Sequence, residues 1–144
     1  GETVKFGATV TVADEDTGVI PRGQGETILL VEDDEKLRKM GQSTLRLLGY
    51  RALVAADGRE ALAVYAAEGG VDVVVTDIMM PEMDGRALAK ELRQVNPDVK
   101  VLGVTGYGEV KPAGFLDVIH KPFDIETLAR AIRRALHTGV GRWT

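Results

Sequence analysis

Apolar and polar positions alternate along the chain in blocks that predict strands and helices in turn between residues 27 and 137. Five short blocks are rich in β-branched and apolar residues, and the first and third are almost continuously apolar, as in strands covered on both faces. The predicted strands are "TILLV" (27–31), "YRALVAAD" (50–57), "VDVVVTD" (71–77), "KVLGVTG" (100–106) and "LDVIH" (116–120).

Four longer blocks repeat apolar residues at the spacing of amphipathic helices. They cover residues 35–48, residues 59–68, a segment after Asp84 and a segment after Asp124. Each of these two aspartates can cap its helix, and Gly49 is placed to end the first helix. The apolar positions of the first helix are Leu37, Met40, Leu45 and Leu48.

This alternation predicts an α/β fold with a mostly parallel sheet between two layers of helices and right-handed crossovers. In such sheets, ligands bind beyond the carboxyl ends of the strands, where the strand order reverses. The residues that follow those strand ends are polar and chemically compatible with one another: Glu32, Asp33, Asp77, Thr105 and Lys121.

The acidic members of this set suit a divalent cation. Glu32, Asp33 and Asp77 would repel one another when crowded at one edge, and a cation relieves that repulsion. Oxygen ligands with room for water suit Mg²⁺, or Mn²⁺ in its place. Asp77 would then be a nucleophile that accepts a phosphoryl group as an acyl phosphate. Lys121 would neutralise one phosphoryl oxygen, and Thr105 would donate a hydrogen bond to another.

Each of these segments, taken alone, also has a purely structural interpretation. "EDDE" (32–35) can be a solvated helix N-terminus, "TDI" (76–78) a capped turn, and "KPF" (121–123) a loop before a helix. The methionines after Asp77 are interpreted as packing side chains: Met79, Met80 and Met83. The structural interpretations do not explain why all the segments occur in this order, each at a strand end.

Composition narrows the classes of function. The 144 residues carry a net charge of −4 with a pI near 5.2, and no basic run, which argues against nucleic-acid binding. The absence of cysteine excludes disulfides and thiol chemistry. No apolar stretch approaches transmembrane length and the first residues lack a signal pattern, so we expect a cytoplasmic protein without membrane insertion.

The chain resembles the receiver domain of two-component response regulators in four segments: "ILLVEDDEKLR" (28–38), "VVVTDIMMPEMDG" (73–85), "VLGVTGY" (101–107) and "HKPF" (120–123). The resemblance covers residues 27–137. It implies a flavodoxin-like (βα)5 three-layer sandwich with a five-stranded parallel sheet. It also implies a module that accepts a phosphoryl group from phosphohistidine on a histidine kinase or a phosphotransfer protein, and that catalyses its own phosphorylation and dephosphorylation.

The resemblance further implies roles for single residues. Asp77 would be the phosphoacceptor, Thr105 the switch hydroxyl and Lys121 the phosphate-pairing lysine. Among the cation ligands, Asp33 would bind the metal directly. The implied ligand set is Glu32, Asp33, Asp77 and the backbone carbonyl of Met79.

Two features depart from the receiver pattern. Thr105 and Lys121 are only 16 positions apart (121 − 105), and the segment between them contains three glycines and a proline. We therefore predict that the fourth helix is short or missing. The aromatic switch residue usually lies three positions before the lysine, where this chain has Val118, and Tyr107 is the candidate substitute. Both departures fall on the face that most receivers use to dimerise and signal.

The N-terminal residues do not belong to a typical receiver. Residues 4–12 alternate as a strand does, and residues 13–25 have the composition of a linker. "GETVKF" (1–6) resembles the closing strand of a histidine-kinase ATP-binding domain, which implies the C-terminal part of a hybrid sensor kinase. A disordered tail is the alternative, and pairing with a sheet edge, in strand exchange or a homodimer, also stays open. The expected division is an N-terminal strand and linker (1–26), a receiver (27–138) and a tail (139–144).

Three alternative functions stay open at this point. An aspartyl-phosphate phosphohydrolase would need a second acid two positions after the nucleophile, where this chain has Met79. A metal-binding pseudo-receiver without phosphotransfer would not need the retained Asp77, Thr105 and Lys121. A stand-alone single-domain response regulator would share the same site as the receiver of a hybrid kinase.

Overall fold

The computed structural model describes residues 19–106 and 114–138. Its strands are β1 (Thr27–Val31), β2 (Arg51–Ala55), β3 (Val73–Asp77), β4 (Val101–Thr105) and β5 (Asp117–His120). Its helices are α1 (Glu35–Leu47), α2 (Gly58–Glu68), α3 (Gly85–Val95) and α4 (Ile125–Leu136). The predicted strands and helices are therefore confirmed, with ends that differ by a few residues.

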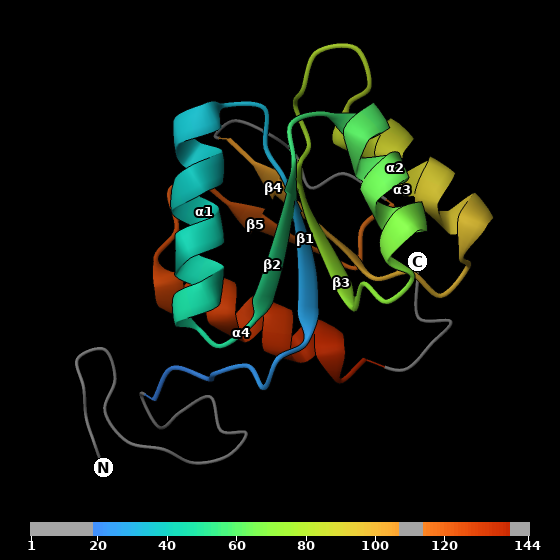
Figure 1. Ribbon diagram of the computed structural model, residues 1–144. Helices are drawn as coiled ribbons and strands as arrows, with labels where there is room; N and C mark the ends of the chain where they lie inside the picture. The colour runs from blue at the N-terminus through green and yellow to red at the C-terminus, as the bar shows by residue number, and fades with distance from the viewer. Residues whose placement is uncertain (1–18, 107–113, 139–144) are drawn as a thin grey trace.

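The five strands form one parallel sheet in the order β2-β1-β3-β4-β5. Helices α1 and α4 cover one face of the sheet, and α2 and α3 cover the other (Figure 1). This is the expected flavodoxin-like sandwich. Four helices are found among the described residues. The fourth helix that the sequence predicts to be short or missing would lie between β4 and β5, where residues 107–113 are outside the described residues.

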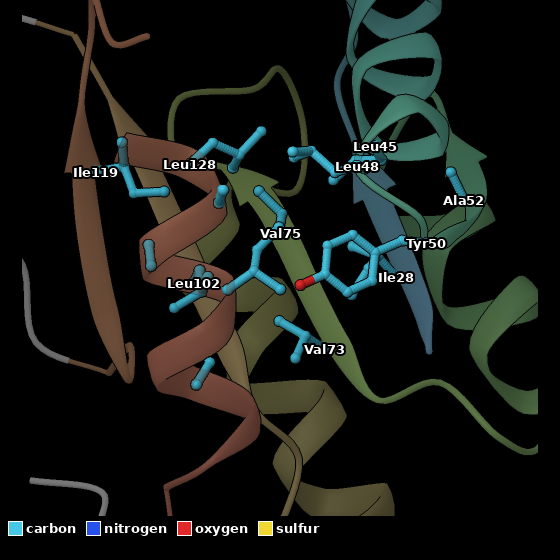
Figure 2. Close-up of a cluster of buried hydrophobic side chains, with 14 of the residues drawn as sticks. Ile28, Leu45, Leu48, Tyr50, Ala52, Val73, Val75, Leu102, Ile119 and Leu128 are labelled. Carbon is cyan, nitrogen blue, oxygen red and sulfur yellow. The ribbon is translucent and has the colours of Figure 1, made fainter. Parts of the chain in front are cut away.

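Successive residues of the central strands supply the two cores in turn. In β1, Ile28 packs into the cluster beneath α1 and α4, whereas Leu29 packs into the cluster beneath α2 and α3. Figure 2 shows the first cluster, in which the Tyr50 ring lies beside Ile28 and near Val73. Burial of apolar surface on both faces makes the central strands the rigid base from which the strand-end residues project.

Aspartate side chains cap all four described helices at the same edge of the sheet. Asp84 accepts a hydrogen bond from the Ala87 amide and Asp124 accepts one from the Thr127 amide, as predicted. Asp34 and Asp57 cap α1 and α2 in the same way. Each such cap is worth about 1 kcal/mol relative to alanine. The caps fix where each loop turns into its helix, and so hold the loops at the carboxyl edge.

Ile78 and Phe115 cover Gly103 of β4 on the α3 side of the sheet, and a Cβ on Gly103 would lie 2.8 Å from Ile78 Cδ1. Phe115 is buried, and a Cβ placed on Gly103 of β4 would lie 3.1 Å from its ring. The backbone at this point is held by Arg93 of α3, whose guanidinium donates to the Gly114 carbonyl at 2.7 Å. Ile78 and Phe115 thus pack over Gly103, which has no side chain to displace them.

Residues 19–26, here called the N-terminal strap, pack against the domain before β1 begins. The amides of Gly23 and Gly25 donate to the carbonyls of Leu48 and Gly49, at 2.6 and 2.9 Å. Further contacts are made by the Arg22 guanidinium with the Leu47 carbonyl, by the Arg130 guanidinium with the Val19 carbonyl, and by Ile20 with the core. This part of the expected linker therefore joins the end of α1 to α4.

Several predictions concern residues outside the described ones. They are the strand over residues 4–12, the role of Tyr107 and the tail 139–144. In the part of the chain that is described, no helix has the length and apolar character needed to cross a membrane.

Candidate functional site

Three carboxylates converge at the carboxyl ends of β1 and β3. The parallel register pairs Val31 with Thr76, so the next residues, Glu32 and Asp77, follow at the same level of the sheet. Each of Glu32, Asp33 and Asp77 offers a carboxylate oxygen, and these oxygens lie within 4.8 Å of one another. The sheet therefore brings together the acidic residues that the sequence singled out.

Burial shifts the ionisation of two of these carboxylates. Asp77 is 8% exposed, and this burial raises its pKa despite the opposing effects of the Lys121 ammonium and the Met79 amide. Burial also raises the pKa of Glu32, with a smaller contribution from the charge of Asp77 and against the Asp34 amide. The site therefore favours any partner that neutralises these carboxylates.

Lys121 provides the nearest cationic side chain to Asp77. Its ammonium lies 3.5 Å from Asp77 Oδ2, and its backbone amide donates to the Thr105 carbonyl at 2.8 Å. The Lys121–Pro122 peptide is cis. The side chain is one-third exposed, so the ammonium can reach both the carboxylate and a group that approaches from solvent. The structure thus places Lys121 beside Asp77, and its predicted pairing with a phosphoryl group stays a prediction.

Thr105 ends β4, the strand next to β3. Its side chain is fully buried, and its Oγ1 has no hydrogen-bond partner among the described residues. A buried hydroxyl without a partner costs free energy, in the range of about 1–3 kcal/mol. Thr76 of β3 is equally buried, yet its hydroxyl donates to the Asp77 carbonyl at 2.9 Å. Thr105 Oγ1 is thus available for a group that enters the site.

The loop after Asp77 wraps around its carboxylate. The Met79 amide donates to Asp77 Oδ1 at 3.3 Å, which places Met79 beside the phosphoacceptor candidate. Met80 is buried and Met83 packs against the core, as predicted. Met79 differs, because 61% of it is exposed to solvent beside the site. The role of its backbone carbonyl as a metal ligand stays a prediction.

An apolar groove of about 650 Å³ runs from Asp77 and Lys121 between α1 and α4. Leu37 and Met40 of α1 line it and are 45% and 59% exposed, and Phe123 lines the opposite side. The sequence assigned Leu37 and Met40 to the apolar face of the first helix, but in the structure this part of the face lies outside the core. Their place in the groove was not predicted. It could have been inferred from their position in the first turns of α1, next to the acidic strand end.

The switch residues expected from the sequence are only partly described. Val118 lies in β5 opposite Gly103 and packs against the cluster beneath α2 and α3. Tyr107 lies outside the described residues. Val118 is therefore a packing residue here, and the structure does not join it to the acidic cluster.

The residues of the site fit a hard divalent cation. The ligand atoms are carboxylate oxygens from two neighbouring strand ends, and two of the carboxyl groups have raised pKa values because of burial. Mg²⁺ favours oxygen ligands and needs few of them from protein, since it keeps several waters. The described cluster contains neither histidine nor cysteine, the ligands that zinc prefers.

Comparison with known proteins agrees with this geometry. A family model for the response regulator receiver domain matches residues 28–133. Sensor kinase CckA of Brucella abortus is 43% identical over 120 residues, which cover 76% of this chain but only 12% of the kinase. The chain thus spans a small part of that relative.

Two solved structures are similar to most of the chain. The receiver domain of hybrid histidine kinase CckA is 35% identical with a TM-score of 0.67, over 77% of this chain and 99% of that one. Response regulator TrrA of Thermotoga maritima, in complex with Mg²⁺-BeF, is 28% identical with a TM-score of 0.72, over 77% and 99% of the two chains. Taken with the family match over residues 28–133, these similarities establish that the chain belongs to the response regulator receiver domains of two-component systems.

Proposed function

We propose that this receiver takes a phosphoryl group from a phosphohistidine onto Asp77. One observation carries the proposal: a carboxylate, an ammonium and a hydroxyl come together at the carboxyl edge of the sheet. A buried carboxylate lies 3.5 Å from an ammonium, and a buried hydroxyl without a partner ends the neighbouring strand. The negative charge of a phosphoryl group would be matched by Lys121, and its oxygen would satisfy Thr105 Oγ1.

The transfer exchanges one bond to phosphorus for another. A carboxylate oxygen of Asp77 forms a new P–O bond while the P–N bond of the donor phosphohistidine breaks. The electron pair of that bond leaves with the imidazole nitrogen, which then takes a proton from solvent. The strand behind Asp77 holds its carboxylate, and the Met79 amide, which donates to Oδ1, orients it. Oδ2 faces Lys121.

We infer that the acidic cluster holds Mg²⁺, or Mn²⁺, as receiver domains do at their acidic pocket. The proposed ligands are Glu32, Asp33, Asp77 and the backbone carbonyl of Met79, with Asp33 binding directly. The cation would supply positive charge against the phosphoryl oxygens. Burial has raised the pKa values of Glu32 and Asp77, so their carboxylates gain from a cation more than solvated carboxylates would.

The phosphodonor is proposed to be a histidine kinase or a phosphotransfer protein with an apolar helix face. The groove between α1 and α4 is continuous with Asp77 and Lys121, and Leu37, Met40 and Phe123 are exposed along it. An apolar face carrying the phosphohistidine would bury these side chains. Leu37→Asp should therefore slow transfer from a protein donor, while phosphorylation by the small donor acetyl phosphate should be unaffected.

We further propose that the chain is the cytoplasmic receiver of a hybrid sensor kinase. The 43% identity to sensor kinase CckA supports this origin, as does the likeness of residues 1–6 to a kinase ATP-binding domain. In this view residues 1–26 connect the kinase to the receiver (27–138), and the tail 139–144 follows. Its strap residues, 19–26, would then carry the connection onto the receiver surface.

Intact mass spectrometry tests the central proposal. The chain is incubated with acetyl phosphate and Mg²⁺, alongside Asp77→Asn as the matched variant. We expect a gain of one phosphoryl mass in the wild-type chain only, and its loss when a chelator removes the metal. No gain in a folded wild-type chain, with acetyl phosphate or with a protein donor, would contradict the proposal and favour a pseudo-receiver.

A further inference from the structure

The acidic loop between β1 and α1 is held by a side chain that the proposed chemistry does not use. The guanidinium of Arg38, in the second turn of α1, folds back over the helix start. Its Nη1 donates to the Glu32 carbonyl at 3.0 Å, with a longer contact of 3.4 Å to the Asp33 carbonyl. Every other residue from Asp33 to Met40 is exposed, whereas Arg38 is half-buried. The side chain is therefore packed against the loop.

The other restraints on this loop act on different groups. The Glu32 amide donates to the Ala55 carbonyl of β2 at 3.1 Å, and the Asp34 amide donates to Glu32 Oε2 at 3.0 Å. Asp34 also caps α1 through the Leu37 amide. These bonds fix the start and the end of the loop. Arg38 holds the two carbonyls in between, which belong to the two acidic residues of the β1 strand end.

We propose that Arg38 is a positioning residue for the cation site. By holding the Glu32 and Asp33 carbonyls it fixes the two peptide planes, and with them the directions in which both carboxylates leave the backbone. The carboxylates then converge near Asp77 before a cation arrives, so binding requires less ordering of the loop. This inference rests on the proposed function, since it concerns the same Mg²⁺ site.

The fixed plane of the guanidinium is the property that matters. Both contacts come from one nitrogen, Nη1, whose two hydrogens are held in that plane and can be directed at the two carbonyls. A lysine ammonium supplies a similar charge without a fixed plane. Loss of an orienting group behind a metal site typically costs 10–100-fold in affinity. We expect Arg38→Met to weaken Mg²⁺ binding by about tenfold. Arg38→Lys should recover only a minor part of that loss.

Arg46→Met is the matched control, because Arg46 is an exposed arginine on the same helix, about 12 Å further along its axis. Mg²⁺ is titrated into each full chain by calorimetry at constant ionic strength. We expect unchanged affinity for Arg46→Met. Equal affinity of Arg38→Met and wild type would overturn the inference, and so would full recovery in Arg38→Lys, which would assign the effect to charge alone.

A second measurement is made without metal and does not depend on activity. Exchange of the Asp34 amide reports loop order, because this amide donates to Glu32 Oε2. We expect its exchange to be several-fold faster in Arg38→Met, with amides of the central strands unchanged. Unchanged exchange of the Asp34 amide would overturn the inference. Failure of the wild-type chain itself to bind Mg²⁺ would instead contradict the proposed function, which separates the two failures.

Discussion

The two ends of the sheet differ in how their charged groups are arranged. At the carboxyl end three carboxylates crowd together, Thr105 Oγ1 lacks a described partner, and apolar side chains of α1 remain exposed. At the amino end the strap donates to the backbone beyond α1. There the Thr27 amide donates to Asp72 Oδ2 at 2.8 Å, and Arg51 pairs with Glu68 at 2.8 Å.

This difference separates stability from function within one small domain. The crowded carboxylates and the Thr105 hydroxyl at the carboxyl end lower the stability of the metal-free chain, but they are the groups that a cation and a phosphoryl group would satisfy. At the amino end the buried Tyr50 hydroxyl also has no hydrogen-bond partner among the described residues, but no group of crowded carboxylates is found there in the described chain. Substitutions at the two ends should therefore act on different observables.

The largest effect is expected from removal of the cationic side chain at the carboxyl end. Lys121→Met should slow phosphorylation by acetyl phosphate by about 100-fold, because a buried oxyanion loses its nearest fixed positive charge. The rate is followed by intact mass spectrometry. Lys90→Met, which removes an exposed lysine from α3, is the control and should keep the wild-type rate. Equal rates for both variants would exclude Lys121 from the transfer.

The next effect is expected at the amino end and should concern stability alone. A Cβ on Gly23 would lie 2.3 Å from the buried Tyr50 ring, so Gly23→Ala must displace the strap or the ring. Overpacking of this kind costs about 1–3 kcal/mol. Urea unfolding measures the loss. Gly70→Ala, at a position with open space, is the control, and similar stability of the two variants would show that the strap is not packed as described.

A smaller pair of effects should have opposite signs on two neighbouring strands. Thr105→Val replaces a hydroxyl without a partner and should stabilise the chain by up to about 1 kcal/mol. Thr76→Val removes a hydroxyl that donates to the Asp77 carbonyl and should destabilise it by about 1 kcal/mol. Thr105→Val should also slow phosphorylation several-fold. A loss of stability in both variants, measured by urea unfolding, would contradict the difference between the two hydroxyls.

Much of the fold and the site could be predicted because periodicity and strand ends determine them. The strand of valines that ends in Asp77 and the acidic pair after β1 require only the rule that parallel strands end at one edge. The strap could not be predicted, since its hydrogen bonds to α1 and α4 described above all end on backbone carbonyls, which leave no pattern in residue types. The packing role of Phe115 was also missed, because a single buried aromatic residue in a loop has no period. Leu37 and Met40 follow the helical pattern of apolar residues, but the pattern does not reveal whether the neighbouring helix α4 covers them. Their exposure could therefore not be predicted.

The smallest and most diagnostic effect is a pH dependence that differs in sign between the two ends. Burial raises the pKa of Asp77 above its ordinary 3.8, so the folded metal-free chain binds this proton more tightly than the unfolded chain. Its contribution to stability is present below pH ~4 and is lost as the pH rises through the raised pKa. Glu68 has a pKa lowered from 4.5 by its hydrogen bond with Arg51, so its contribution is lost as the pH falls.

Urea unfolding of the metal-free chain from pH ~3 to ~8 can separate these two signs. The stability of Asp77→Asn relative to wild type should increase with pH, because the variant has no buried carboxylate to ionise. The stability of Glu68→Gln relative to wild type should decrease with pH over the lower part of the range, and by less, since its pair with Arg51 is exposed to solvent. If stability changes with pH in the same way in all three chains, neither Asp77 nor Glu68 contributes to the pH dependence, and the predicted difference between the two ends is wrong. Added Mg²⁺ should reduce the pH dependence attributed to Asp77 and leave that of Glu68 unchanged, because within the described residues the group of carboxylates that suits a cation lies at the carboxyl end.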